Sequence, residues 1–285
     1  MTNAFDRVRR VTAPLVEKPI LSLPLPFSVQ RRAFEIGARV LKRVPPAAVG
    51  WTAPAGVRTR IATPEGARGR LLWLHGGGFV MGSARSYAAL TDRLAIRAGL
   101  EVWCPDYRLA PEHPFPAAPD DCTAVATAIP GPFHLGGDSA GGTLALVVLQ
   151  RLLDIGRPPE SVTLISPGTD LRGDRDLPEH REMVFSEAVL RRFQRAYVGG
   201  ADPTDPRVSP IRGTYCGAPP TLIELSEGEF LEHDGRRLAR RMREQGVAVT
   251  LRVEPGVPHD YHIFAGRSAA ADRALDRIAA HIGRA

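Results

Sequence analysis

Short hydrophobic runs alternate with longer amphipathic stretches along most of the chain. Several runs are continuous, which is typical of strands buried on both faces of a parallel sheet. The runs that predict strands lie at 57–64, 70–75, 100–104, 133–137, 161–166, 221–225 and 249–253. The stretches that predict helices include 86–99, 142–156, 235–246 and 267–283, and they end on glycine, as helix C-termini tend to. This alternation predicts an α/β fold with a mainly parallel central sheet flanked by helices.

The first fifty residues differ from the rest, since two proline-rich interruptions flank one amphipathic stretch. Phe34, Ala38 and Leu41 recur at helical spacing within 31–43. We interpret this stretch as a basic amphipathic helix that packs over the main domain. Attachment to a membrane surface is the alternative that we favour less, because it rests only on the basic side chains. Those side chains are Arg31, Arg32, Arg39, Lys42 and Arg43.

A long excursion interrupts the alternation between the fifth and sixth expected strands. It contains an expected helix at 187–199 and a proline-rich run. In a compact α/β domain, a segment of this length is more often a functional insertion than a plain loop. We therefore expect residues 1–50 and an insertion at about 170–210 to form a helical cap, and residues 51–285 to form the main domain.

Composition supports a globular protein and argues against several other classes. The 285 residues are 44% hydrophobic and 24% charged, close to ordinary globular usage. No stretch reaches the roughly 18 consecutive apolar residues of a spanning helix, so we expect no integral membrane association. The formal charge of +6 comes from basic residues spread along the chain, without a recognition helix or finger pattern. We therefore expect no nucleic-acid binding.

The cysteines and the N-terminal stretch indicate the cellular compartment in which we expect the protein. Cys104, Cys122 and Cys216 are widely separated and show none of the close spacings of a zinc site or a redox pair. The first residues carry arginines and prolines where a signal peptide would carry an apolar run and a cleavage site. We therefore expect a cytoplasmic protein.

A candidate nucleophile lies in the glycine-rich segment 136–142. Gly137, Ser139 and Gly141 form a G-x-S-x-G pattern after an expected strand and before an expected helix. This is the context of a nucleophile elbow, a tight turn whose small residues avoid clashes and leave the hydroxyl exposed. The turn would also place Ser139 near a helix N-terminus, which favours developing negative charge. A plain strand-to-helix turn is the alternative, because glycine and serine are common.

A second glycine-rich segment, 75–79 (HGGGF), follows another expected strand. Three consecutive glycines let the backbone turn its N–H groups toward a substrate, as the oxyanion of an acyl-transfer intermediate requires. A phosphate-binding loop is the rival interpretation, but no Lys-Ser/Thr follows the glycines and no G-x-G-x-x-G precedes an acid. We favour the oxyanion interpretation, and the presence of Ser139 strengthens it.

The general base should lie late in the chain, because a serine in a nucleophile elbow is followed first by its acid and then by its histidine. His259 fits this order, on the loop after the last expected strand. His262 is a rival that we expect to orient or to pack. A metal site made by the two histidines is disfavoured, because no cysteine or carboxylate with suitable local spacing completes it.

The acid should follow the strand expected at 221–225, where four carboxylates are available. We choose Glu229. A carboxylate in this role holds the imidazole tautomer and stabilises the imidazolium, which glutamate does as well as aspartate. We expect Glu227, Glu232 and Asp234 to form a solvated cluster at a helix start, where negative charge is favoured.

Taken in order, these segments resemble the hormone-sensitive lipase family of α/β-hydrolases, the bacterial family IV esterases. The resemblance runs from about residue 56 to the C-terminus. The matching segments are 75–79 (HGGGF), 106–121 (DYRLAPEHPFPAAPDD), 137–141 (GDSAG), 209–210 (SP), 227–235 (EGEFLEHDG) and 258–266 (PHDYHIFAG). The resemblance implies an α/β-hydrolase fold with an eight-stranded, mostly parallel sheet, and a cap built from the N-terminal helices plus the insertion.

The resemblance also implies hydrolysis of short- to medium-chain esters. Carried over position by position, it makes Ser139 the nucleophile and His259 the base. It assigns the oxyanion donors to the backbone of Gly77, Gly78 and Ala140. The other motif residues are His75, Gly76, Gly137, Asp138 and Gly141.

Two departures from the family pattern concern the partner of the histidine. The family's acid is an aspartate in D-P-L-R-D, whereas the matched position here is Glu229, followed by phenylalanine. The family's H-G-F at the histidine is H-D-Y here, which makes Asp260 a second candidate partner of His259. Adjacency along the chain rarely gives the geometry that orientation at Nδ1 needs, so Glu229 remains our choice.

We therefore predict a serine carboxylesterase that acylates Ser139, releases an alcohol and deacylates with water activated by His259. We expect a small-molecule ester substrate and no metal or diffusible cofactor, and a homodimer is compatible with this interpretation. Amide or lactone hydrolysis by the same triad is the nearest alternative. A non-catalytic ligand receptor is disfavoured, because receptors that resemble this family lose the histidine that is present here.

Overall fold

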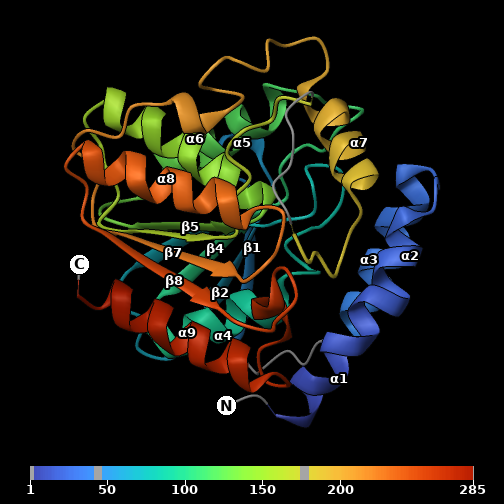
Figure 1. Cartoon of the computed structure of the whole chain (residues 1–285). Coiled ribbons are helices and arrows are strands. Elements are labelled where there is room, and N and C mark those ends of the chain that lie inside the picture. The colour runs from blue at the N-terminus through green and yellow to red at the C-terminus, as the bar shows by residue number, and fades with distance from the viewer. Residues whose placement is uncertain (1–2, 42–46, 174–179, 285) are drawn as a thin grey trace.

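The computed structural model describes residues 3–41, 47–173 and 180–284 (Figure 1). Lys42 and Arg43 of the predicted basic helix lie outside these ranges, and so does part of the expected insertion. Within the described ranges, no helix combines the length and the apolar character needed to cross a bilayer.

One eight-stranded sheet forms the centre of the molecule. Its strands are β1 (Ala48–Thr52), β2 (Thr59–Thr63), β3 (Arg70–Leu74), β4 (Glu101–Pro105), β5 (His134–Asp138), β6 (Val162–Ile165), β7 (Thr221–Ser226) and β8 (Val249–Glu254). They are ordered β1-β2-β4-β3-β5-β6-β7-β8, with β2 antiparallel to both neighbours and the other pairs parallel. The prediction of a mostly parallel sheet is confirmed.

β1 is a strand that we did not predict from the hydrophobic pattern. It is exposed along its whole length and pairs only with β2, at the edge of the sheet. An edge strand with no buried face needs no hydrophobic run, so the pattern that revealed the other strands is missing here. The sheet therefore begins before residue 50, inside the segment that we assigned to the cap.

Helices cover both faces of the sheet (Figure 1). α4 (Ala88–Ala98) and α9 (Ala269–Ile282) pack together on one face. α5 (Ala117–Ala128), α6 (Ala140–Asp154) and α8 (Glu232–Glu244) lie on the other. Short 3-10 turns occur at Pro54–Gly56, Pro210–Arg212 and Tyr261–Phe264.

The central strand β3 contributes to two separate hydrophobic cores. Its Leu71 and Trp73 belong to the core under α4 and α9, and its Leu72 and Leu74 belong to the core under α5, α6 and α8. Successive side chains of a strand point to opposite faces, so a strand covered on both sides must be apolar throughout. This explains the continuous hydrophobic run of β3.

The N-terminal helices lie at one end of the sheet, outside the two helix layers (Figure 1). They are α1 (Ala4–Thr12), α2 (Lys18–Ser22) and α3 (Phe27–Leu41), with a π-helical segment, Ala13–Glu17, between the first two. α7 (Glu187–Val198), from the expected insertion, contacts α2. α3 begins earlier in the chain than the helix that we predicted.

Hydrogen bonds tie the N-terminal helices to the main domain. The Asn3 amide caps α1 and also donates to the carbonyl of Arg267 at 2.8 Å. Arg31 of α3 donates to the carbonyls of Val80 at 2.6 Å and Ala110 at 2.7 Å. The predicted basic helix therefore packs against the domain, and Arg31 contributes to that contact.

The carboxyl ends of the strands bring the candidate residues together. Ser139 directly follows β5, Glu229 follows β7, and His259 follows β8. Because these strands are parallel and adjacent strands end at the same edge, the three residues meet although they are far apart in sequence.

Candidate active site

Ser139 occupies a sharp turn between β5 and α6. Its backbone has a φ of +51°, a left-handed conformation that is strained for a residue other than glycine. A Cβ on Gly141 would collide with the carbonyl oxygen of Leu74, and one on Gly137 would collide with the carbonyl of Gly141. Close backbone approach therefore requires both glycines of the G-x-S-x-G pattern, as the elbow interpretation predicts.

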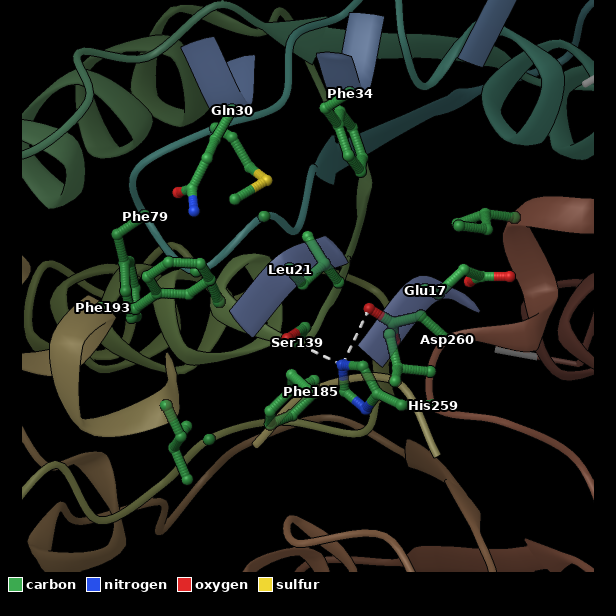
Figure 2. A pocket seen from close by; sticks show the side chains of 18 of the residues that line it. Glu17, Leu21, Gln30, Phe34, Phe79, Ser139, Phe185, Phe193, His259 and Asp260 are labelled. Carbon is green, nitrogen blue, oxygen red and sulfur yellow. Dashed lines mark hydrogen bonds and ion pairs between the residues drawn. The ribbon is translucent and has the colours of Figure 1, made fainter. Parts of the chain in front are cut away.

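His259 lies between Ser139 and Glu229. Its Nε2 is 3.1 Å from the Ser139 hydroxyl, a contact drawn in Figure 2. Its Nδ1 is 2.5 Å from Oε2 of Glu229. The side chains of His259 and Glu229 are 6% and 2% exposed, so water screens their interaction little. The structure thus places acid, imidazole and hydroxyl in the sequence of contacts that a catalytic triad needs.

Two serines hold the carboxylate of Glu229. Its Oε1 accepts hydrogen bonds from the Ser226 backbone N–H at 2.9 Å and from the Ser166 hydroxyl at 2.5 Å. We did not single out Ser166 from the sequence. It directly follows β6 at the edge where the candidate residues gather, and that position is the signal that could have marked it.

The neighbouring carboxylates differ in their surroundings. Glu227 is exposed, as expected. Asp234 is fully buried and accepts backbone N–H bonds from Thr169 at 3.1 Å and Asp170 at 3.3 Å. Our expectation of a solvated Asp234 is therefore wrong, because the residue anchors the chain that follows β6.

Asp260 adjoins the same imidazole at its other nitrogen. Its Oδ2 lies 3.1 Å from Nε2 of His259 (Figure 2). Glu229 occupies Nδ1. Asp260 has a φ of +50° and precedes the 3-10 turn Tyr261–Phe264. It therefore does not take the place of Glu229 at Nδ1.

The carboxylates around His259 change how it titrates. Burial alone would lower the pKa of His259, but the charges of Asp260 and Glu229 outweigh burial and raise that pKa well above its usual value. Burial, reinforced by the charge of Asp260, also raises the pKa of Asp138 to about 8. We therefore expect the neutral imidazole to form at a higher pH than in an exposed histidine.

Gly77 and Gly78 of the HGGGF segment line the same cavity as Ser139. Gly77 and Gly78 have φ values of +114° and +61°, which glycine adopts without strain. Among the turn, loop and cap hydrogen bonds of the described residues, none uses the N–H of Gly77, Gly78 or Ala140. These groups are available to bind an oxyanion.

Two motif side chains support the glycine loop. The His75 ring stacks on that of Tyr107 with centroids 4.2 Å apart, and the Tyr107 hydroxyl donates to the His75 carbonyl at 2.6 Å. Asp138 accepts hydrogen bonds from the Gly76 N–H at 3.1 Å and the Trp73 indole at 3.0 Å. His75 and Asp138 thus fix the backbone of the loop.

A largely apolar cavity of about 390 Å³ opens beside Ser139. Leu21 and Phe34 reach it from the N-terminal helices, and Phe185 and Phe193 reach it from the segment before and within α7 (Figure 2). The Phe185 ring meets the His259 ring edge-on at 5.0 Å. From the sequence we singled out only Phe34 of these four, as part of a helix that packs over the domain, because apolar residues look alike whether they face a core or a cavity.

Glu182, Glu229 and His259 place potential metal-ligating atoms within 4.8 Å of one another. Their atoms already have hydrogen-bond partners. The Glu182 oxygens accept from the backbone N–H groups of Val184 at 2.7 Å and Phe230 at 3.2 Å. Atoms of this cluster are therefore already engaged in hydrogen bonds within the protein.

His262 lies apart from this chemistry. Its Nε2 is 3.0 Å from Oε2 of Glu224, and Arg277 donates to the same carboxylate at 2.8 Å. Both His262 and Glu224 are buried. His262 therefore packs within a buried polar cluster, in agreement with the structural role that we expected.

Comparisons with known proteins find an α/β-hydrolase family model and similar ester hydrolases. A family model described as the α/β-hydrolase fold matches residues 71–263. An acetyl-hydrolase of Streptomyces hygroscopicus is 38% identical over 204 residues, 68% of each chain. Carboxylesterase NlhH of Mycobacterium tuberculosis is 31% identical over 265 residues, 85% of this chain and 83% of the relative. A crystal structure of an esterase from the bacterial hormone-sensitive lipase family superposes with a TM-score of 0.89 at 28% identity, covering 99% of this chain and 98% of that one.

Proposed function

The chain belongs to the hormone-sensitive lipase family of α/β-hydrolases and is a carboxylic ester hydrolase, and we propose that it works through an acyl-enzyme on Ser139. The observation that carries this proposal is the unbroken chain of contacts from Glu229 through His259 to Ser139. A serine hydroxyl becomes a nucleophile only when a base takes its proton, and His259 is the base within reach.

The proposed acylation begins with transfer of the Ser139 proton to Nε2 of His259 as Oγ attacks the ester carbonyl. The N–H groups of Gly77, Gly78 and Ala140 would bind the resulting oxyanion, and Glu229 would stabilise the imidazolium. His259 then gives the proton to the alcohol oxygen, the C–O bond breaks, and the alcohol leaves. Water activated by His259 hydrolyses the acyl-enzyme and restores Ser139.

We further propose that the cavity sets the size of the substrate. Its apolar walls suit short- to medium-chain acyl groups, and the acetyl-hydrolase among the relatives supports the short end of that range. In this proposal, the described part of residues 1–50 and α7 act as a cap, because both supply walls of the cavity. A panel of p-nitrophenyl esters with increasing acyl length tests the proposal by giving kcat/KM for each length.

Filling the cavity should change this chain-length preference. Leu21 lines the cavity, so Leu21→Trp removes room for longer acyl chains. We expect kcat/KM for p-nitrophenyl octanoate to fall by about tenfold relative to that for p-nitrophenyl acetate. Each methylene of the acyl chain that no longer fits the cavity costs measurable binding energy. Leu23→Trp is the matched control, because Leu23 is 47% exposed. If Leu21→Trp and Leu23→Trp gave the same chain-length profile as the unchanged enzyme, the acyl group would lie elsewhere.

A further inference from the structure

His259 has two oxygen neighbours at the nitrogen that faces the nucleophile. Ser139 Oγ and Asp260 Oδ2 each lie 3.1 Å from Nε2, and Figure 2 shows both contacts. Glu229 occupies Nδ1 on the other side of the ring. The imidazole therefore lies between two carboxylates, whereas a triad needs only one.

We propose that Asp260 is a second carboxylate partner of His259, which holds the imidazolium in the resting enzyme and thereby sets the pH at which the enzyme becomes active. The proposal rests on the assignment of His259 as the base. Asp260 contacts Nε2, the atom that accepts the Ser139 proton, and it acts by stabilising the form of the ring in which Nε2 is protonated.

The chemistry follows from the two forms of the ring. The imidazolium offers an N–H to Glu229 at Nδ1 and another to Asp260 at Nε2. The neutral ring instead turns a lone pair at Nε2 toward the Asp260 carboxylate, which is repulsive, and only the neutral ring can accept the Ser139 proton. Raising the pH releases the Nε2 proton to solvent and frees the base.

The surroundings leave Asp260 few other ways to balance its charge. Among the ion pairs of the described residues, Asp260 pairs only with His259, and its Oδ1 has no hydrogen-bond partner. Asp138 at the end of β5, Glu229 after β7 and Glu182 carry carboxyl groups, so they add no positive charge. Arg9 lines the same cavity as Asp260, but its guanidinium pairs with Glu17. Tyr87, at the start of α4, donates its hydroxyl to Asp138.

The backbone conformation at Asp260 gives a second argument for a role of its carboxylate. Its φ of +50° is a left-handed conformation in which glycine is unstrained and which aspartate and asparagine tolerate. The turn itself therefore does not require a carboxylate. The raised pKa of His259, to which Asp260 contributes the larger opposing charge, agrees with a side chain that stabilises the imidazolium.

The test compares the pH dependence of kcat/KM for p-nitrophenyl acetate, measured by pH-stat, in the unchanged enzyme, Asp260→Asn and Asp260→Gly. Loss of the carboxylate should lower the midpoint of the acid limb by at least about one pH unit in both variants, because the pKa of His259 falls. At a pH one unit below the original midpoint, kcat/KM should then be about fivefold higher. The high-pH plateau should stay within a few-fold.

Glu227→Gln is the matched control, because it removes one exposed carboxylate from the loop near the site. Its acid limb should coincide with that of the unchanged enzyme. If the limbs of both Asp260 variants also coincided with it, or moved to higher pH, the proposal would be wrong.

A second readout does not depend on catalysis. Nitrogen-15 NMR of the His259 ring in Ser139→Ala should show the imidazolium persisting to a higher pH than in Ser139→Ala/Asp260→Asn. Identical titrations in the two proteins would overturn the role of Asp260. A fully active Ser139→Ala protein would instead overturn the acyl-enzyme proposal, so the two failures can be told apart.

The outer face of the N-terminal helices exposes hydrophobic side chains. Large exposed hydrophobic side chains recur from α1 through the π-helical segment to the residue after α2. They are Val8, Val11, Leu15, Val16, Ile20 and Leu23. The buried Asp6, Arg9 and Ala13 recur at the same spacing on the opposite face. Within this apolar stripe, Val8, Val11 and Leu15 therefore point away from the domain, whereas Ile20 is both exposed and part of the lining of the catalytic cavity.

The exposed charges beside this stripe have one sign. Arg7, Arg10, Arg32 and Arg39 are exposed, whereas each acidic residue described between 3 and 39 is buried or half-buried. Val29 and Ile36 of α3 add apolar surface that is 44% and 61% exposed. Leu21 and other residues of the same helices line the catalytic cavity, so this face lies next to the site.

We infer that this face, the outer surface of α1 to α3, docks on an anionic lipid surface. An apolar stripe flanked by arginines is the combination that binds at the boundary of anionic headgroups and acyl chains. Docking there would bring an ester that partitions into lipid close to the cavity.

Flotation with phosphatidylglycerol-containing vesicles tests this inference in the full chain. We expect binding that weakens as salt is raised, and an affinity at least about tenfold lower for Leu15→Asp. Ile155→Asp is the matched control, because Ile155 at the end of α6 is 61% exposed and Leu15 is 70% exposed. Hydrolysis of a soluble acetate ester should be unchanged in both variants.

Two results would overturn the inference. One is equal binding of Leu15→Asp and Ile155→Asp, which would place the contact elsewhere. The other is no vesicle binding combined with a dimer, seen by light scattering, that Leu15→Asp dissociates. That outcome would assign the face to a second copy of the chain.

Discussion

Replacing Ser139 with alanine should abolish ester hydrolysis and leave the fold intact. The hydroxyl carries the bond that forms in the proposed acylation, and removal of such a nucleophile lowers kcat by about 10⁶ in serine hydrolases. Among the described residues, the Ser139 hydroxyl has a hydrogen bond only to His259, so we expect the fold to tolerate its loss. Initial rates with p-nitrophenyl acetate, together with thermal melting, measure the two effects separately.

A fluorophosphonate probe gives this prediction a covalent readout. The unchanged enzyme should gain the mass of one phosphonyl group, and the peptide that contains Ser139 should carry it. Ser139→Ala should gain none. Labelling at another residue, or retention of activity in Ser139→Ala, would show that a different nucleophile operates.

The hydrophobic pattern predicted most of the sheet, and its failures have a common cause. A continuous apolar run marks a strand buried on both faces, as in β3, but the exposed edge strand β1 carries no such mark. α5 (Ala117–Ala128) was also not predicted. It is rich in alanine and has a proline inside its first turn, so it shows little contrast between its faces.

The site could be predicted where chain order and local motif decide the chemistry. Ser139 has the motif of the elbow, and His259 has its position after the last strand. Contacts between distant segments could not be predicted in the same way. Ser166 bonds Glu229 across 63 positions of sequence, and no local pattern predicts that contact.

For Asp260, the sequence indicated a candidate contact with His259 but not its geometry. The sequence placed Asp260 next to His259 and made it a candidate partner, but only the structure shows which ring nitrogen it meets. With φ at +50°, its carboxylate meets Nε2 and leaves Nδ1 to Glu229. The departure from the family pattern at Asp260 therefore changes the surroundings of Nε2 of His259, and the departure at Glu229 changes the residue at Nδ1.

The assignment of the acid can be tested by changing one atom. Glu229→Gln keeps the shape of the side chain but removes its charge, and it places an amide where Nδ1–H, Ser226 N–H and the Ser166 hydroxyl now donate. The wrong tautomer of His259 would then be favoured. When a triad acid becomes its amide, kcat falls by about 10⁴, and we expect a loss of up to that size.

Two aspartate variants show whether this loss is specific. Asp260→Asn should retain the plateau activity, because it leaves the Nδ1 contact in place. Asp234→Asn should mainly lower the melting temperature, because Asp234 is a buried acceptor of backbone N–H bonds and does not contact His259. Plateau kcat at high pH and melting curves for the three proteins separate these effects. If Glu229→Gln kept nearly full activity while Asp260→Asn lost it, Asp260 would be the acid. If all three remained active, His259 would be oriented by another group, and the role assigned to Glu229 would have to be abandoned.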